Sequence, residues 1–235
     1  MSGSLNFYEV LVLKICVLIP AYNEEKEIGR LVAQVRAKGL DVIVVDDGSN
    51  DQTSLLAQNN GALILHNKPR QGKGFSLKRG FAYLVENGYD GVITMDGDGQ
   101  HDPQDLRFFL EAAQDRKMCV VNGTRMQDTG SMPFVRRVTN WFMSWMISRI
   151  CRQHIEDTQC GYRYISADVL RQISLTSNDF EIETEVLIKS CRAGCQVISA
   201  PVKTIYSDEK SNINPVKDTI RFFAYLWRDH KSQKQ

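Results

Sequence analysis

The residues best suited to chemistry are acidic side chains that follow an apolar run near the middle of the chain. The segment VITMDGDGQHDPQD places carboxylates at Asp96 and Asp98 and an amide at Gln100. In a regular strand the two carboxylates would lie too far apart to share one ion, but Gly97 and Gly99 allow the chain to curl there. Mg²⁺ and Mn²⁺ bind such oxygens and usually complete their coordination with substrate phosphates. The segment predicts half of a metal-diphosphate site, and the alternative is a simple Asp and Gly turn.

Composition limits the classes of function. The 235 residues include 29 basic and 28 acidic side chains, so no overall field favours a nucleic-acid partner. The six cysteines lack paired metal-ligand spacing, which predicts reduced thiols in a cytoplasmic protein. The longest apolar run is far below the ~20 residues of a membrane span, and no signal peptide is evident. Any membrane contact is therefore expected to be peripheral, at the inner membrane surface.

Alternation of apolar runs with amphipathic segments predicts the α/β class, a doubly wound, mostly parallel sheet with helices on both faces. The expected strands cover residues 14–19, 41–45, 62–66 and 91–95, and the expected helices cover 21–39, 72–88 and a segment that begins near Asp51. In the first helix one face collects Ile28, Leu31, Val32 and Val35. Ligands of such sheets bind at the carboxyl ends of the strands, where every motif here falls.

The pattern changes after residue 125. We expect an apolar helix at 133–153, a strand or loop at 157–166, a helix at 181–193, one or two strands at 196–206 and a last helix at about 215–229. No linker is visible, so residues 1–235 are expected to form one domain. Its nucleotide-binding half would cover about 14–125 and its acceptor half about 126–235.

Two groups of residues at strand ends suit a nucleoside. Asp46 and Asp47 end the second strand and can accept hydrogen bonds from a base and a ribose, or can cap the following helix. Pro20, Tyr22 and Glu24 end the first strand, where Tyr22 could stack on a base, or they form an ordinary helix entry.

Lys73 and His101 have less specific surroundings. Lys73 lies between Gly72 and Gly74, a pattern that offers a cation and close backbone approach to phosphate but is also common in plain turns. His101 is a metal-ligand candidate, although a lone histidine beside a proline turn is more often structural.

Taken together in this order, the motifs resemble the family 2 glycosyltransferases, in particular the branch of dolichyl- and polyprenyl-phosphate sugar synthases. The segments that carry the resemblance are PAYNE (20–24), VDDGSNDQT (45–53), GKG (72–74), MDGDGQH (95–101), GTR (123–125), DTQCGYR (157–163), FEIETE (180–185) and IYSDEKSNINPVKD (205–218). The resemblance covers almost the whole chain, and the ordered set is specific although each segment alone is not.

The resemblance implies the GT-A fold, a nucleotide-sugar donor and a Mg²⁺ or Mn²⁺ ion held by Asp96, Asp98 and Gln100. The implied nucleotide-binding residues are Pro20, Tyr22, Glu24, Asp46, Asp47, Lys73, Asp96, Gly97 and Arg125. The residues expected to take part in catalysis are Asp98, Arg163 and Glu185. The candidates for an acceptor or phosphate are Arg136, Arg137 and Lys210, with surface ion pairing as the alternative.

These expectations combine into a metal-dependent transfer of a hexose from a UDP- or GDP-sugar, with inversion implied by the resemblance. The expected acceptor is a polyprenyl phosphate, which is largely dianionic at neutral pH and needs no strong base. A hydroxyl acceptor of a soluble transferase would need a base, for which Glu181, Glu183 and Glu185 are available. Two less favoured functions are those of a sugar nucleotidyltransferase and of a non-catalytic nucleotide-binding protein.

The late helices carry apolar and basic faces that suit a membrane surface or core packing. In the last helix one face collects Val216, Ile220, Phe223 and Trp227, and a basic stripe collects Lys217, Arg221 and Arg228. Trp141 and Trp145 present the same two possibilities in the earlier apolar segment.

Overall fold

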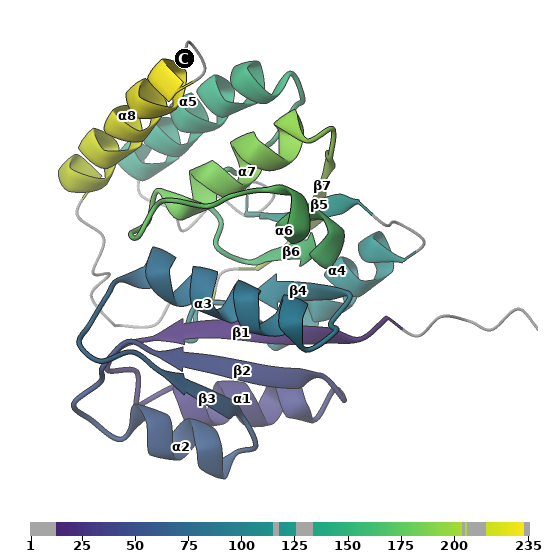
Figure 1. Ribbon diagram of the computed structural model, residues 1–235, viewed down its shortest axis with the longest axis vertical. Coiled ribbons are helices and arrows are strands. Elements are labelled where there is room, and N and C mark those ends of the chain that lie inside the picture. The colour runs from purple at the N-terminus through teal and green to yellow at the C-terminus, as the bar shows by residue number, and fades with distance from the viewer. Residues whose placement is uncertain (1–12, 115–117, 126–133, 204, 206–214, 233–235) are drawn as a thin grey trace, which may run out of the picture.

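The protein is built on one seven-stranded sheet with the strand order β3-β2-β1-β4-β6-β5-β7 (Figure 1). The computed structural model describes residues 13–114, 118–125, 134–203, 205 and 215–232. The strands are β1 (Ile15–Ala21), β2 (Asp41–Asp46), β3 (Leu63–His66), β4 (Gly91–Thr94), β5 (Cys119–Thr124), β6 (Arg163–Ser166) and β7 (Gln196–Pro201). All neighbours pair in parallel except β6, which runs antiparallel to both β4 and β5.

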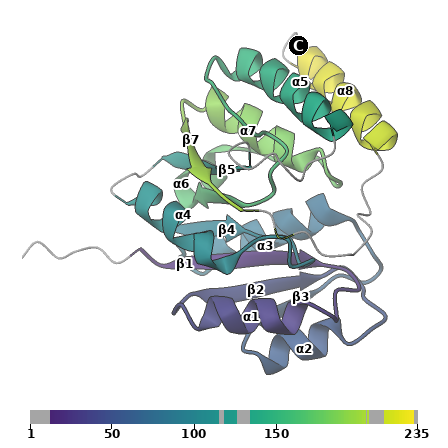
Figure 2. The same cartoon turned by 180° about the vertical axis from the view of Figure 1, so that it is seen from behind.

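Helices cover both faces of the sheet, as the sequence predicts (Figures 1 and 2). The described helices are α1 (Ile28–Arg36), α2 (Thr53–Asn59), α3 (Lys73–Glu86), α4 (Leu106–Ala113), α5 (Phe134–Cys151), α6 (Ala167–Gln172), α7 (Ile182–Arg192), α8 (Pro215–Ser232) and the short 3-10 helix η1 (Pro103–Asp105). One core joins α1, α2 and α4 to one face of the sheet. The other joins α3, α5, α6, α7 and α8 to the opposite face.

The first strands follow the sequence pattern closely, whereas α1 runs only from Ile28 to Arg36 and not over the expected 21–39. The predicted apolar face of α1, with Ile28, Leu31, Val32 and Val35, is fully buried. Strand β1 continues through Pro20 to Ala21, two residues beyond the expected end. Pro20 is tolerated because the β1-β4 pairing has already ended at Leu18, so one side of the strand needs no donor there.

The second half of the chain completes the same sheet. Strand β6 lies between β4 and β5, and its Tyr164 pairs with Ile93 on one side and Val121 on the other. The sequence pattern predicts a strand or loop at 157–166 and gives no prediction for α4 or β5. Because β6 joins the two halves through backbone hydrogen bonds, residue 125 does not mark a gap between separate sheets.

Two further expectations concern cysteines and membrane spans. All six cysteines are free thiols, and five of them are buried. Within the described ranges, no helix combines the length and the apolarity needed to cross a bilayer.

Candidate active site

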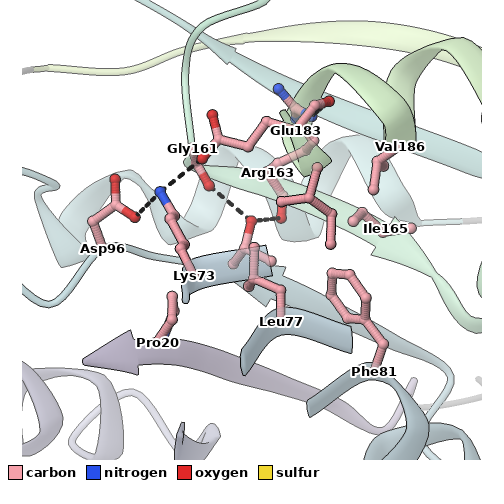
Figure 3. A pocket seen from close by; sticks show the side chains of 12 residues that line it. Pro20, Lys73, Leu77, Phe81, Asp96, Gly161, Arg163, Ile165, Glu183 and Val186 are labelled. Carbon is pink, nitrogen blue, oxygen red and sulfur yellow. Dashed lines mark hydrogen bonds and ion pairs between the residues drawn. The ribbon is translucent and has the colours of Figure 1, made fainter. Parts of the chain in front are cut away.

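The carboxyl ends of β1 and β4 meet the start of α3 and the start of α7 around one pocket. Its lining residues are Pro20, Lys73, Leu77, Phe81, Thr94, Asp96, Gly161, Arg163, Ile165, Ile182, Glu183 and Val186. Figure 3 shows charged side chains at one end of this pocket and apolar side chains along the other. The pocket therefore draws residues from both halves of the chain.

Lys73 is the central cation of the pocket (Figure 3). Its Nζ lies 2.6 Å from Asp96 Oδ1 and 2.7 Å from Glu183 Oε1, and its side chain is 17% exposed. Burial alone would lower the pKa of Lys73, but the two carboxylates outweigh burial and raise it. The first residue of α3 thus carries a fixed positive charge between the end of β4 and the start of α7.

Asp96 and Asp98 differ in their electrostatic surroundings. Burial would raise the pKa of Asp96, but Lys73 and His101 hold it well below its ordinary value. The His101 Nε2 atom lies 3.4 Å from Asp96 Oδ2. Burial raises the pKa of Asp98, and the nearby Asp96 charge raises it further. Two carboxylates forced together in this way are a favourable place for a cation.

The carboxylates fit a hard divalent metal ion whose coordination is shared with a substrate. The Asp98 Oδ1 atom accepts the backbone N–H of Gln100 at 3.0 Å, so the turn after β4 curls as the glycines allow. Among the described residues, no cluster of three His, Cys, Asp or Glu side chains could hold a metal alone. Mg²⁺ commonly uses one or two carboxylates and takes further ligands from substrate phosphates, so Asp96 and Asp98 suit that arrangement.

Asp47 shapes the loop that leads into Lys73. Its Oδ1 accepts the N–H of Gln71 at 2.8 Å and the Asn67 Nδ2 at 2.9 Å, and its Oδ2 accepts the N–H of Gly72 at 2.8 Å. The side chain is buried and fully engaged by this loop. The structure therefore brings Asp47 to the strand end as predicted, with a local role in fixing the backbone before α3.

Asp46 stabilises the opposite loop. Its Oδ1 accepts the N–H of Ser49 at 2.9 Å, and its Oδ2 accepts the Ser54 hydroxyl at 2.6 Å. Burial would raise the pKa of Asp46, but these hydrogen bonds lower it. Direct capping at the start of α2 comes from Asp51, whose Oδ1 accepts the Thr53 N–H at 3.0 Å.

Tyr22, Glu24 and Gly97 lie beside the pocket. The Arg70 guanidinium covers the Tyr22 ring at 3.7 Å from its centroid, and its Nε lies 3.7 Å from Asp47 Oδ2. A Cβ at residue 97 would come within 3.2 Å of the Glu24 side chain, so Gly97 permits a close approach. Arg70 was not among the predicted residues, although it stands in the segment that connects β3 to the expected phosphate loop.

Arg125 and Arg163 are committed to partners within the protein. Arg125 makes a bidentate pair with Asp157, with its Nε and Nη2 2.7 and 2.9 Å from the two carboxylate oxygens. Arg163 lines the pocket, and its donors reach Asn122 Oδ1 at 2.8 Å and the Glu183 carbonyl at 2.7 Å. Burial lowers the pKa of Arg163. Arg163 therefore braces the pocket wall through protein contacts, whereas Arg125 is not among the lining residues and is held by Asp157.

Glu183 and Glu185 occupy different environments in the structure. Glu183 lines the pocket, whereas Glu185 is completely buried and is not among the lining residues. Its carboxylate accepts the N–H groups of Thr176 and Ser177 at 2.9 and 2.8 Å and pairs with Lys189 at 2.6 Å. Burial would raise the pKa of Glu185, but Lys189 and the N–H donors lower it to about 2. The prediction that Glu185 takes part in catalysis is therefore not supported by its position, because Glu183 is the glutamate at the pocket.

Glycines set the close packing of the pocket. A Cβ at Gly161 would lie 3.0 Å from both Asp96 Oδ2 and Glu183 Oε1. At Gly72 and Gly74 a Cβ would come within 2.7 and 2.6 Å of the backbone of Asn178. The GKG pattern was expected to allow a phosphate to approach the backbone. In the structure, the backbone of 178–179 packs closely against these two glycines. Gly161 was not predicted, because its role depends on carboxylates distant in sequence.

The predicted acceptor residues lie partly outside the described part. Lys210 and the side chain of Arg136 lie outside the described residues, whereas Arg137 is exposed near the start of α5. On α8, Phe222 and Tyr225 are buried while Phe223 and Trp227 are exposed, so this helix packs against the core and also presents aromatic rings. The side chains of Val216, Lys217 and Ile220 also lie outside the described residues.

We define the aromatic surface as the exposed rings of α5 and α8, helices that lie side by side in both views (Figures 1 and 2). These residues are Trp141, Phe142, Trp145, Phe223 and Trp227, of which Trp141 is 64% exposed and Trp227 is 61% exposed. Arg149 lies over the Trp145 ring, and Lys231 lies 3.9 Å from the centroid of Trp227. The aromatic surface therefore combines large apolar side chains with cations.

Comparison with known proteins identifies the family. The model of glycosyl transferase family 2 matches residues 16–174. The undecaprenyl-phosphate mannosyltransferase of Micrococcus luteus is 30% identical over 203 residues, which cover 81% of this chain and 83% of that protein. A UDP-N-acetylglucosamine–dolichyl-phosphate N-acetylglucosaminyltransferase of Methanococcus voltae is 28% identical over 217 residues, covering 83% of this chain and 86% of that protein.

Solved structures support the fold. The glucosyl-3-phosphoglycerate synthase of Mycobacterium tuberculosis, solved with Mn²⁺ and UDP, superposes with a TM-score of 0.67 at 18% identity. The match covers 85% of this chain and 74% of that one. The chain belongs to glycosyl transferase family 2, and it is a GT-A glycosyltransferase of the branch similar to dolichyl- and polyprenyl-phosphate sugar synthases.

Proposed function

We propose that the protein transfers a hexose from a UDP- or GDP-sugar to a polyprenyl phosphate, with inversion and with a Mg²⁺ or Mn²⁺ cofactor. The observation that carries this proposal is the cluster of Asp96, Lys73 and Glu183 at the end of β4, in a chain of this family. The cluster supports the proposal because it gathers in one pocket a carboxylate that would bind a metal ion and a cation that would bind a diphosphate. Relatives named for undecaprenyl phosphate and dolichyl phosphate support the choice of acceptor.

The donor would bind along the carboxyl ends of β1, β2 and β4. Asp96, Asp98 and Gln100 would hold the metal ion, which supplies Lewis-acid stabilisation of the departing diphosphate when it is bound. Lys73 would add a positive charge to the same diphosphate. The Tyr22 ring, one face of which carries the Arg70 guanidinium, would provide its other face for the base. Asp47 supports this arrangement by fixing the loop from which Lys73 extends.

A phosphate acceptor and a hydroxyl acceptor would require different catalytic groups. A phosphate monoester has a second pKa near ~6, so at neutral pH its oxygen attacks without a strong base. A hydroxyl acceptor needs a general base, and Glu183 is the glutamate that the pocket offers. The Lys73 ammonium lies 2.7 Å from Glu183 Oε1, so this carboxylate is already engaged in an ion pair within the protein. This contact favours the phosphate acceptor over a soluble transferase acting on a glycan or protein hydroxyl.

The aromatic surface suits the membrane that would contain such an acceptor. Tryptophan rings favour the interface between lipid and water, and each basic residue near an anionic surface contributes ~1 kcal/mol. Arg137 and Arg149 on α5 and Lys231 on α8 are exposed cations of these two helices. We therefore propose a cytoplasmic protein that works at the inner membrane surface through α5 and α8.

A product assay tests the proposed function. Purified protein is supplied with UDP- and GDP-sugars, Mn²⁺ or EDTA, and either a short polyprenyl phosphate or the corresponding polyprenyl alcohol. We expect transfer to the phosphate, none to the alcohol, no transfer with EDTA, and an inverted anomeric configuration by NMR. Transfer to the alcohol, to a sugar hydroxyl or to a protein would contradict the polyprenyl-phosphate acceptor.

A further inference from the structure

The Lys73 ammonium occupies the same carboxylate that the proposed metal ion needs. Its Nζ is 2.6 Å from Asp96 Oδ1, a direct ion pair in a pocket where the Lys73 side chain is only 17% exposed. Two cations on one carboxylate repel each other, and limited exposure to water leaves that repulsion poorly screened. Lys73 and a divalent ion at Asp96 are therefore in competition.

Glu183 offers Lys73 a second position. The Nζ atom is already 2.7 Å from Glu183 Oε1, so the ammonium can leave Asp96 and remain ion-paired. A lysine ammonium has three donors on a flexible stem, and it can turn toward a diphosphate while it keeps this bond. The Lys73 side chain can therefore release Asp96 and keep its ion pair with Glu183.

The backbone of Lys73, in contrast, is held in place. Asp47 accepts the N–H of Gly72 at 2.8 Å, and the Phe75 N–H donates to the Asn178 carbonyl at 3.1 Å. Gly72 and Gly74 also pack directly on the 178–179 backbone. Any exchange of partners by Lys73 is therefore a movement of its side chain while the start of α3 stays in place.

We propose that Lys73 couples metal binding to donor binding, because it competes with the divalent ion for Asp96 until the donor diphosphate draws the ammonium away. The inference rests on the proposed function, since it takes a nucleoside diphosphate and a divalent ion as the ligands of this pocket. Its consequence is cooperativity. The metal alone binds weakly, and the diphosphate strengthens metal binding by more than its own oxygen ligands provide.

The test measures Mn²⁺ affinity directly by electron paramagnetic resonance of free Mn²⁺. Titrations are made without nucleotide and with UDP or GDP, and are corrected for the Mn²⁺-nucleotide complex in solution. Lys73→Met should bind Mn²⁺ alone about tenfold more tightly than wild type, because a charge-assisted contact no longer opposes it. The factor by which nucleotide strengthens Mn²⁺ binding should fall about tenfold, whereas Lys73→Arg should stay close to wild type.

Lys78→Met is the matched control. It removes the same charge from the same helix, but its ammonium bonds to the Thr176 carbonyl and to Asn178 Oδ1. We expect wild-type Mn²⁺ affinity and wild-type cooperativity for this variant. An equal effect of the two methionine variants would show a general charge effect and would contradict competition at Asp96. If Lys73→Met does not fold, Lys73→Gln removes the charge while it keeps a hydrogen-bond donor, and it carries the same expectation.

The outcomes separate this inference from the proposed function. Wild-type protein that binds Mn²⁺ with UDP or GDP, together with an unchanged Lys73→Met titration, overturns the coupling and leaves the proposed function standing. Wild-type protein that binds neither nucleotide in the presence of Mn²⁺ overturns both.

Discussion

The pocket at the carboxyl ends of β1 and β4 differs from the aromatic surface in how its side chains are covered. Around the pocket, buried polar side chains such as Asp46 and Asp47 are satisfied by hydrogen bonds from neighbouring loops. On the aromatic surface, large rings such as Trp141 and Trp227 are mostly exposed. An exposed apolar patch of this kind typically marks a surface for a partner or a membrane. The polar groups around the pocket are thus satisfied within the protein, whereas the exposed rings have no such cover among the described residues.

The largest effect is expected from removing one of the two carboxylates in the turn after β4, beside the pocket. Asp98→Asn should lower the transfer rate about a hundredfold or more, because the leaving diphosphate loses electrostatic stabilisation. Since burial and Asp96 raise the pKa of Asp98, its charge is unfavourable in the folded protein, and the variant should melt no lower than wild type. Initial rates, calorimetry with UDP and GDP, and thermal melting measure these effects.

Asp102→Asn is the control for this prediction, because the Asp102 carboxylate accepts the Gln104 N–H at the start of η1. Its transfer rate should remain close to wild type. Nucleotide affinity that is the same in EDTA and in Mn²⁺, for wild type and Asp98→Asn alike, would show that these carboxylates do not hold a metal ion.

A smaller effect separates the two glutamates at the start of α7. Glu185→Gln should reduce the free energy of unfolding by about 2 kcal/mol at pH 7, because buried N–H donors and Lys189 lose a charged acceptor. The folded pKa of about 2 lies below the ordinary value of 4.5. The stabilisation is therefore complete above pH 4.5 and decreases as the pH falls from 4.5 toward 2. Urea denaturation at several pH values should show wild type and variant converging in acid.

Glu183→Gln provides the comparison for that experiment. Glu183 lines the pocket, and Lys73 keeps its ion pair with Asp96 when Glu183 is replaced, so this substitution should change the unfolding free energy by less than about 1 kcal/mol. Equal destabilisation by both substitutions would contradict the distinction between a pocket residue and a structural one.

The smallest expected effect tests the aromatic surface. Trp141→Ser combined with Trp145→Ser should weaken binding to anionic liposomes roughly tenfold at low salt and leave the melting temperature unchanged, because both rings are exposed. Salt should weaken the remaining binding of wild type. Liposome sedimentation measures this, with Leu55→Ser on α2 as a control for a similarly exposed apolar residue. If the double variant sediments with liposomes as well as wild type does, the aromatic surface is not the membrane-binding surface.

The sequence predicted the parts of the fold that depend on local pattern. The buried face of α1 follows from helical spacing, and the position of Asp96 and Asp98 follows from an apolar strand that ends in acids and glycines. The antiparallel direction of β6 was not predicted, because it depends on pairing with strands distant along the chain. Functional roles are hard to predict for the same reason, because the hydrogen-bond partners of a carboxylate decide whether it is available for chemistry or stabilises the fold.

Arg163 and Glu185 illustrate this limit. Both belong to motifs that the resemblance associates with function, and their residue types suit phosphate binding and base catalysis. Their hydrogen-bond partners, among them Asn122 and Ser177, lie on other elements or loops and only the folded chain reveals them. Gly161 was not predicted, because its two close neighbours, Asp96 and Glu183, come from the end of β4 and from α7.

The contact of Gly72 and Gly74 with the 178–179 backbone has a consequence for recombining members of this family. Two segments distant in sequence meet there, and because residues 72 and 74 carry no side chain, the backbone of one segment approaches the backbone of the other closely. A chimera that joined the first half of one relative to the second half of another would have to preserve both glycines and the conformation of 178–179 together. These two segments should therefore be exchanged together, as a matched pair, when hybrid chains are designed.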